Sequence, residues 1–501
     1  MSGFFVVLER GLLVRRSAVV ILMMGFNLLG LSAHAVPQSS SVLPLGDGSV
    51  RPVKTETRGA VRYEFTQYSV PSENDPKLNQ SQLIAADLQL GLKTENTASK
   101  MDFTGGKYLD LNNSYFSVQE LYTSRGFQRD AITVAVGRKI EFWSQVDRDW
   151  ELGLWEPKYN IDSLRPVNQG LTGVFLKMQN GLWEFSSYLS PIFVPTINPD
   201  ISEKNGSLRS DSRWFKTPAN EGQVLNRDTR LVYSISVPEL SKLVGKPGAG
   251  MRLRFGGRGE PGLWASANFA RKPINSLFIQ YDYNLYLAAS GSQAEVEVTP
   301  TVSYHRIYGA DLGWAFSKAM VSASFLTDEP ETQKPENERD QATNENTTDW
   351  IKQEPGRLKV YALHAETKAL IPRFFEPVAI SLDYIKADEQ ETRDIDAKGD
   401  VRGAMFPYRV NFANAASLKT TVSTALFAKP FLVSFRYLRD FDQQGSLWTL
   451  MGQYAPARDW SLHAGVDILG SDDTSTGNTS KRFLNQFRAN DRFYGGLSYV
   501  F

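Results

Sequence analysis

The chain has 501 residues, with 55 Lys and Arg against 55 Asp and Glu, so its formal net charge is 0. This balance excludes the strongly basic surface that a nucleic-acid-binding protein needs, and we expect no nucleic acid as a partner. The chain has no cysteine, which excludes a disulfide framework and thiolate metal sites.

The N-terminal residues have the pattern of a secretory signal peptide. Three arginines precede the apolar run 17–31, and Ala33 and Ala35 supply the small residues that flank a cleavage site. About 15 apolar residues are also fewer than the roughly 20 that a membrane-spanning helix needs. We therefore predict a signal peptide over 1–35, followed by a short N-terminal segment over 36–57.

The rest of the chain alternates between apolar and polar residues, with the period of a β-strand that has one apolar face. Beyond residue 35 no apolar run approaches 18 residues, so a chain that crosses a membrane would have to do so with strands. Soluble all-β proteins alternate too, but they usually divide into domains of about 100 to 150 residues. The alternating segments here continue to the C-terminus: 277–285, 304–316, 378–384, 418–426, 431–437, 448–454, 460–468 and 493–501.

We predict one all-β domain over 58–501, a transmembrane antiparallel up-and-down β-barrel. Short turns are expected at Asn180-Gly181 (type I′), 271–273, 317–319 and Lys429-Pro430. Long polar loops are expected at 139–170, 194–227, 327–356, 386–413 and 470–490. We place the short turns and 36–57 in the periplasm and the long loops outside the cell. Counting back from the last strand gives about 18 strands, within a range of 16 to 20, and leaves 61–65 as an unpaired extra.

The chain ends on an alternating strand with Gly496, Tyr499 and the terminal Phe501. This ending resembles the recognition strand of Gram-negative outer-membrane β-barrels, in which a glycine and two aromatic residues have the same spacing. The resemblance implies location in the bacterial outer membrane, with outer-membrane lipids and the barrel assembly machinery as partners. Aromatic residues make up 12% of the chain, which suits the aromatic girdles of such a barrel.

A tryptophan-rich segment follows Gly137-Arg138-Lys139. This segment resembles porin-type channels, which carry a Gly-Arg-Gln element at the end of an early strand and then a long loop folded into the pore; this chain has Lys139 in place of the glutamine. The resemblance implies that the loop 139–170 narrows a channel. The candidate constriction residues are Trp143, Asp147, Arg148, Asp149, Trp150, Glu151 and Trp155. The alternative is that the tryptophans pack the loop against the barrel wall or join the outer girdle.

Charged residues alternate with apolar ones in the predicted strands, so they would face the lumen if the apolar residues face lipid. The candidate lumen-wall residues are Arg252, Arg254, Asp282, Asp383, Lys419, Arg436 and Asp467. Because both signs of charge occur, the wall would create a transverse field instead of a simple anion or cation filter.

No catalytic motif stands out, since His-Glu-x-x-His and Gly-x-Ser-x-Gly are both absent. His305, His364 and His463 are far apart in the sequence and predict no metal cluster. We therefore predict no enzyme activity and no cofactor, and interpret the chain as a porin-like channel for small hydrophilic solutes. The alternatives are a structural or adhesive barrel with a closed lumen, and a polysaccharide exporter. The sequence indicates neither the solute nor the oligomeric state.

Overall fold

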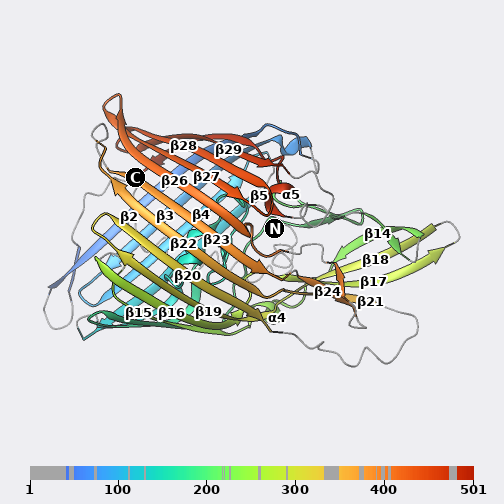
Figure 1. Cartoon of the computed structure of the whole chain (residues 1–501), viewed down its shortest axis with the longest axis horizontal. Helices are drawn as coiled ribbons and strands as arrows, with labels where there is room; N and C mark the ends of the chain where they lie inside the picture. The colour runs from blue at the N-terminus through green and yellow to red at the C-terminus, as the bar shows by residue number, and fades with distance from the viewer. Residues whose placement is uncertain are drawn as a thin grey trace.

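The structure is a computed structural model of the chain (Figure 1). It describes residues 41–44, 50–72, 76–110, 113–128, 131–216, 218, 220–224, 227–257, 261–288, 291–331, 349–371, 377–390, 392–396, 401–403, 408–472 and 482–501. The predicted signal peptide, 1–35, lies outside the described residues and stays a prediction.

The main body is a closed antiparallel barrel of 18 strands, in agreement with the predicted fold and strand number. Consecutive barrel strands pair with each other, and β2 closes the barrel by pairing with β30 as well as with β3. The barrel strands are β2 (Val50–Tyr68), β3 (Gln80–Lys93), β4 (Thr97–Tyr108), β5 (Asn113–Phe127), β6 (Ile132–Lys139), β9 (Leu171–Asn180), β10 (Trp183–Ser190), β15 (Gly248–Phe255), β16 (Gly262–Pro273), β19 (Tyr304–Ala315), β20 (Ala319–Pro330), β22 (Leu358–Ala369), β23 (Val378–Glu389), β26 (Asn414–Leu426), β27 (Lys429–Asp440), β28 (Gly445–Ala457), β29 (Trp460–Ser471) and β30 (Arg492–Val500).

Side chains alternate between the lumen and the outer surface of the barrel along each strand. On β19, Leu312 and Trp314 are about half exposed on the outside, whereas Ile307 and Asp311 are buried on the inside. On β30, Phe493 is exposed while Arg492 is buried. The outer surface therefore carries mainly apolar residues, as a barrel in lipid requires, whereas the interior holds charged residues together with apolar ones such as Ile307.

The connections at the two ends of the barrel differ in length. Two-residue turns join several hairpins at one end, including Gly181-Leu182 and Phe427-Ala428. A type I′ turn needs a positive φ at both of its central residues. Gly181 has a φ of 56°, but the φ of Leu182 is not positive, so this hairpin lacks the predicted type I′ turn. The second turn lies just before the predicted Lys429-Pro430, and both of its residues have positive φ (50° and 60°).

The longest connections extend beyond the opposite end of the barrel and build a second, seven-stranded sheet (Figure 1). We call it the outer sheet. Four connections supply its strands: β13 (Glu221–Val224), β14 (Arg227–Ile235), β17 (Phe278–Ala288), β18 (Gly291–Thr301), β21 (Asp349–Glu354), β24 (Arg393–Asp396) and β25 (Val401–Gly403). Its buried core contains Tyr233, Tyr281 and Val296.

Three predictions about strand placement are wrong. The segment 277–285 is not a barrel strand, because β17 pairs with β18 and β21 in the outer sheet. Residues 271–273 are not a short turn but the end of β16, where a long connection begins. Residues 61–65 are not unpaired, since they belong to β2 and close the barrel. The predicted count of about 18 included the first segment and left out the last.

Part of the predicted N-terminal segment 36–57 is strand. β1 (Ser41–Pro44) pairs with Val50–Val53 at the start of β2. β2 thus begins before residue 58, and the domain boundary itself stays a prediction.

The remaining elements are short: η1 (Pro76–Asn79), α3 (Gln145–Asp149), β7 (Lys158–Tyr159), β8 (Val167–Asn168), β11 (Ser202–Lys204), β12 (Ser207–Arg209), α4 (Leu240–Val244) and α5 (Phe483–Gln486). Within the part of the chain that the structure describes, no helix has the length and apolar character needed to cross a membrane.

Candidate functional site in the barrel interior

Residues 140–170, between β6 and β9, fold into the barrel and contact its wall at distant strands. We call this segment the inward loop. The side chain of Asn268, on β16, donates a hydrogen bond to the Trp143 carbonyl at 3.0 Å. At the far end of the loop, Arg165 forms an ion pair with Asp467 of β29 at 2.7 Å. The loop therefore crosses the lumen from its own strands to two other parts of the wall.

All three tryptophans of the inward loop are buried. Trp143 and Trp155 stack with their ring centroids 5.0 Å apart and their planes 8° from parallel. Trp150 meets Phe412 edge to face at 6.2 Å. The rings lie in one apolar cluster with wall residues such as Ile307 and Leu326. Of the two interpretations, this arrangement favours the one in which the tryptophans pack the loop against the wall. It does not favour the one in which their rings line a pore.

The charged residues predicted for the constriction have two different environments. Asp147 accepts hydrogen bonds from the backbone amides of Leu154 and Trp155 at 2.9 and 3.0 Å, and burial raises its pKa. It therefore shapes the loop. Arg148 and Glu151 are exposed, and the Arg148 guanidinium lies 4.7 Å from the centre of the Phe142 ring.

An aromatic layer adjoins the inward loop and was missed by sequence reasoning. It consists of Trp150, Phe412, Phe483 and Trp214, with neighbouring ring centroids about 6 Å apart: 6.2, 5.8 and 5.9 Å. These residues come from four different connections between barrel strands. No local pattern in the sequence could have predicted contacts between segments so far apart.

The predicted wall residues Arg252 and Arg254 face the lumen from β15 and meet one carboxylate. Glu184 of β10 forms ion pairs with Arg252, with Arg254 at 2.9 Å and with Lys177 of β9 at 2.8 Å. Arg252 is 1% exposed and its guanidinium also lies 5.3 Å from the centre of the Phe142 ring. Three cations thus share one anion beneath the start of the inward loop.

The predicted wall residue Asp467 lies in a second charged cluster, on the other side of the inward loop. It is 1% exposed and accepts hydrogen bonds from Arg165 and from Arg492 of β30, both at 2.7 Å. Arg492 also pairs with Asp162 of the loop at 2.8 Å. Burial alone would raise the pKa of Asp162, but Arg492 and Arg165 hold it below its usual value.

Three other predicted wall residues lie on the barrel wall. Asp383, Lys419 and Arg436 are on neighbouring barrel strands, and Arg436 donates a hydrogen bond to Ser417 at 3.2 Å. The surrounding protein raises the pKa of Glu151 in the inward loop by limiting its hydration, and the positive charges of Lys158, Arg436 and Lys419 oppose that shift.

The prediction that Asp282 lies on the lumen wall is wrong. It lies in β17 of the outer sheet and is not part of the barrel wall. The alternation around it is the same as in a barrel strand, which is why the sequence placed it there.

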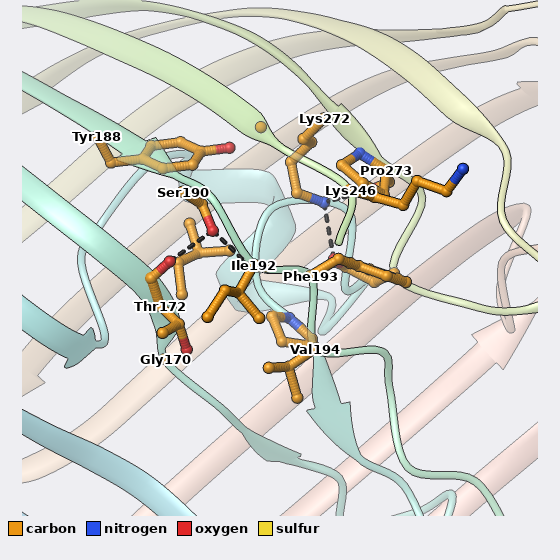
Figure 2. Close-up of a pocket in the computed structure, with 14 residues that line it drawn as sticks. Gly170, Thr172, Tyr188, Ser190, Ile192, Phe193, Val194, Lys246, Lys272 and Pro273 are labelled. Carbon is orange, nitrogen blue, oxygen red and sulfur yellow. Dashed lines mark hydrogen bonds between the residues drawn. The ribbon is translucent and has the colours of Figure 1, made fainter. Parts of the chain in front are cut away.

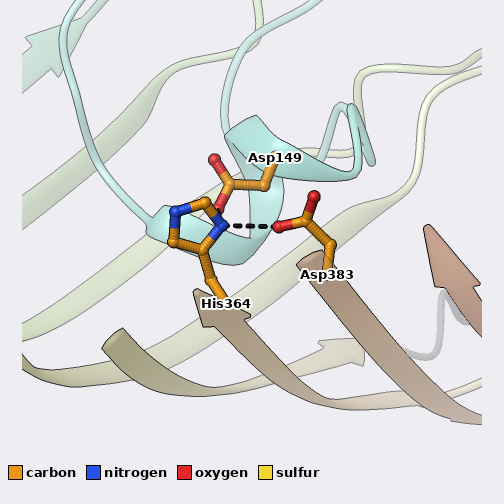
Figure 3. Close-up of side chains that lie close together, drawn as sticks. All are labelled: Asp149, His364 and Asp383. Carbon is orange, nitrogen blue, oxygen red and sulfur yellow. Dashed lines mark hydrogen bonds and ion pairs between the residues drawn. The ribbon is translucent and has the colours of Figure 1, made fainter. Parts of the chain in front are cut away.

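The structure also brings together three side chains that the sequence did not connect (Figure 3). His364 Nδ1 lies 2.5 Å from an Asp383 carboxylate oxygen and 3.4 Å from one of Asp149. Asp149 belongs to the inward loop, while His364 and Asp383 face each other on β22 and β23. Burial raises the pKa of Asp149, and the charge of His364 opposes that effect.

A small pocket lies between the inward loop and the ends of β9, β10 and β16 (Figure 2). Ser190 and Lys272, two of its polar residues, are hydrogen-bonded within the protein, whereas the buried Tyr188 hydroxyl has no hydrogen-bond partner among the described residues. Ser190 Oγ is within hydrogen-bonding distance of the Thr172 and Ile192 carbonyls, and Lys272 Nζ donates to the Leu154 carbonyl at 3.1 Å. The Lys272 hydrogen bond connects the inward loop to the barrel wall. The charged lumen is therefore a stronger candidate for a functional site than this pocket.

The residues of the predicted assembly signal lie at the barrel seam. Tyr499 and Phe501 are exposed on the outer surface, with ring centroids 6.3 Å apart. Phe501 exchanges two backbone hydrogen bonds of 2.9 Å with Gly59 of β2. At Gly496 a Cβ atom would clash with the Tyr63 carbonyl and the His463 ring, so close packing requires glycine there.

Comparison with known proteins returns similarity only at the level of solved structures. No model of a protein family matches the chain, and no curated protein sequence matches it. OccAB4 of Acinetobacter baumannii is 10% identical, covers 89% of this chain and 98% of its own, and has a TM-score of 0.43. OccD3 (OpdP) of Pseudomonas aeruginosa is 9% identical; the alignment covers 95% of this chain and 97% of OccD3, with a TM-score of 0.42. OmpT, an outer membrane protein of Vibrio cholerae, is 9% identical; the alignment covers 90% of this chain and 98% of OmpT, with a TM-score of 0.34.

Proposed function

We propose that the chain is an outer-membrane channel for small hydrophilic solutes, with a lumen narrowed by the inward loop. The observation that carries this proposal is the contrast between the two faces of the closed barrel. Its outer face exposes large apolar side chains such as Leu363 and Leu382, which only lipid can cover over so large an area. Its inner face holds the charged clusters around Glu184 and Asp467.

The charges in the lumen favour polar solutes of mixed character. Arg252, Glu184 and Asp467 are buried in ion pairs, so a solute on its path through the lumen meets the charges that keep exposed surface, such as Arg165 on the inward loop. The Arg148 and Glu151 side chains are exposed beside this path. We expect these two residues to influence which ions pass.

A specific observation favours one alternative function. The aromatic layer and the apolar wall residues around it form one buried cluster across connections from four parts of the barrel. A barrel closed by this layer would act through the outer sheet, as a structural or adhesive protein. The two functions differ in whether an open path exists.

Conductance in planar bilayers decides between the two functions. The purified, folded chain should give discrete current steps if it is a channel. In a KCl gradient, Arg148→Gln should shift the reversal potential toward the K⁺ equilibrium potential, because it removes a positive charge beside the path. Glu151→Gln should shift it toward the Cl⁻ equilibrium potential, because it removes a negative charge. Glu203→Gln, in the exposed β11–β12 hairpin, is the matched control and should change nothing. Folded protein without current steps would refute the channel and favour the closed barrel.

A further inference from the structure

We propose that Asp149, His364 and Asp383 bind a divalent transition-metal ion of the Zn²⁺ class, which fixes the inward loop to the barrel wall (Figure 3). The ligand atoms would be one imidazole nitrogen and two carboxylate oxygens. This combination suits borderline ions such as Zn²⁺ and Co²⁺, and the chain has no cysteine to select a softer ion.

The fold holds two of these ligands rigidly. His364 and Asp383 are direct partners in the β22–β23 pair. Their neighbours Leu363 and Leu382 are more than half exposed on the outer face, so both ligands point into the lumen. The third ligand, Asp149, is the last residue of α3 in the inward loop. The site thus needs the loop in its observed position.

The distances between the ligand atoms are close to those of a metal site. All three atoms lie within 4.8 Å of one another. Bonds of about 2.0 to 2.2 Å to a metal ion place ligand atoms roughly 3 to 3.5 Å apart. The 3.4 Å between His364 Nδ1 and the Asp149 oxygen already fits, and the 2.5 Å to Asp383 requires that carboxylate to retreat by about 1 Å or less.

Two further residues orient the ligands. A Glu366 carboxylate oxygen lies 3.5 Å from His364 Nε2, on the side of the ring away from the cluster. Nε2 makes no hydrogen bond among the described residues, but the negative charge of this carboxylate favours a proton on Nε2, which leaves the Nδ1 lone pair directed at Asp149 and Asp383. The side-chain amide of Gln145 donates a hydrogen bond to Asp149. Metal-binding histidines commonly have such a carboxylate behind them.

The local charge and burial also suit a divalent ion. With a neutral imidazole, the two carboxylates carry a charge of −2, which a divalent ion would balance. The side chains are 11 to 15% exposed, which leaves room for water to complete the coordination. The competing arrangement is a protonated His364 that pairs with both carboxylates without a metal, and the experiment must separate the two.

The direct test is metal titration of the untagged full chain, folded in detergent and freed of metal with a chelator. Calorimetry with Zn²⁺ should show one ion per chain, and Co²⁺ should give a saturable visible absorption band. Asp149→Asn should weaken binding at least about tenfold, and Glu366→Gln should weaken it by less, because Glu366 acts on His364 through its charge and not through a hydrogen bond. His463→Gln, which changes a lumen histidine outside the cluster, should leave the affinity unchanged.

The outcomes are separable from the fate of the proposed channel, because binding is measured without current. Asp149 lies outside the barrel strands, so its variant should keep the heat-modifiable folded form, and this is checked first. Wild-type protein that takes up no stoichiometric Zn²⁺ would overturn the proposal in favour of the protonated histidine. Equal affinity in wild type and Asp149→Asn would overturn the site as assigned.

Discussion

Truncation of Trp155 to alanine tests how the inward loop is held. The side chain is 1% exposed and stacks on Trp143 within the apolar cluster. Its replacement would leave a cavity between loop and wall. Because that cavity is enclosed by packed side chains, we expect a loss of stability and no new path for ions.

The magnitude follows from two opposing contributions. Truncating a buried tryptophan or phenylalanine typically costs about 3 to 5 kcal/mol, which includes the loss of ring stacking. The Trp155 indole N–H has no hydrogen-bond partner among the described residues, and removing an unsatisfied buried donor returns about 1 to 3 kcal/mol. We therefore expect Trp155→Ala to lower the free energy of unfolding by about 2 kcal/mol.

The assay is unfolding in guanidinium chloride followed by tryptophan fluorescence, paired with bilayer conductance. Trp155→Phe is the matched control, since it keeps an aromatic face against Trp143 and removes the unpaired N–H. It should cost less than about 1 kcal/mol. If Trp155→Ala leaves the unfolding free energy unchanged and raises conductance, the ring faces an open channel and our reasoning about its packing is wrong.

Four other changes test separate parts of the structure. Ala428→Gly should raise the unfolding free energy by about 1 kcal/mol, because alanine is strained at its φ of 60°, and a lower midpoint in guanidinium chloride would contradict this. Glu156→Gln should stabilise the protein at neutral pH but not near pH 4. Burial and three neighbouring carboxylates raise the pKa of Glu156, so its contribution to stability is present below the unfolded pKa of about 4.3 and is lost as pH rises through the folded pKa. An equal effect across this pH range in unfolding measurements would refute that cause. Deletion of Phe501 should lower the yield of heat-modifiable protein in the outer membrane, since it removes two hydrogen bonds at the seam and the predicted recognition group, and an unchanged yield would argue against that role. A cysteine at Asn205 should react with an impermeant reagent on intact cells and one at Lys429 should not; the reverse result would invert the proposed orientation.

The barrel could be predicted from the sequence because alternation has a direct physical cause in its two unlike faces. The same pattern could not show which sheet a strand joins. Tyr281 is buried in the outer sheet through contacts with β14 and β18, and nothing local distinguishes its strand from a barrel strand. The inward loop was found from a local cluster of tryptophans, but their burial depends on partners such as Phe412, more than 200 residues away.

The metal ligands were missed for a related reason. Metal-site patterns in sequences rely on short spacings, whereas Asp149 and His364 are 215 residues apart. Their proximity is created by barrel closure and by the path of the inward loop. Prediction from sequence therefore reached the wall and the loop but could not reach the contacts between them.

The outer sheet has a consequence for how the surface of this protein can change. Loops on most barrels are independent units, so one can be exchanged while the others keep their shape. Here β14 pairs in parallel with β18, and β21 lies between β17 and β24, so four connections share one hydrogen-bonded ladder. An insertion or a proteolytic cut in one connection would deprive its neighbours of their partners. The exposed surface should therefore vary as a unit, and epitope grafts should succeed at the tips of its hairpins before they succeed by exchange of whole loops.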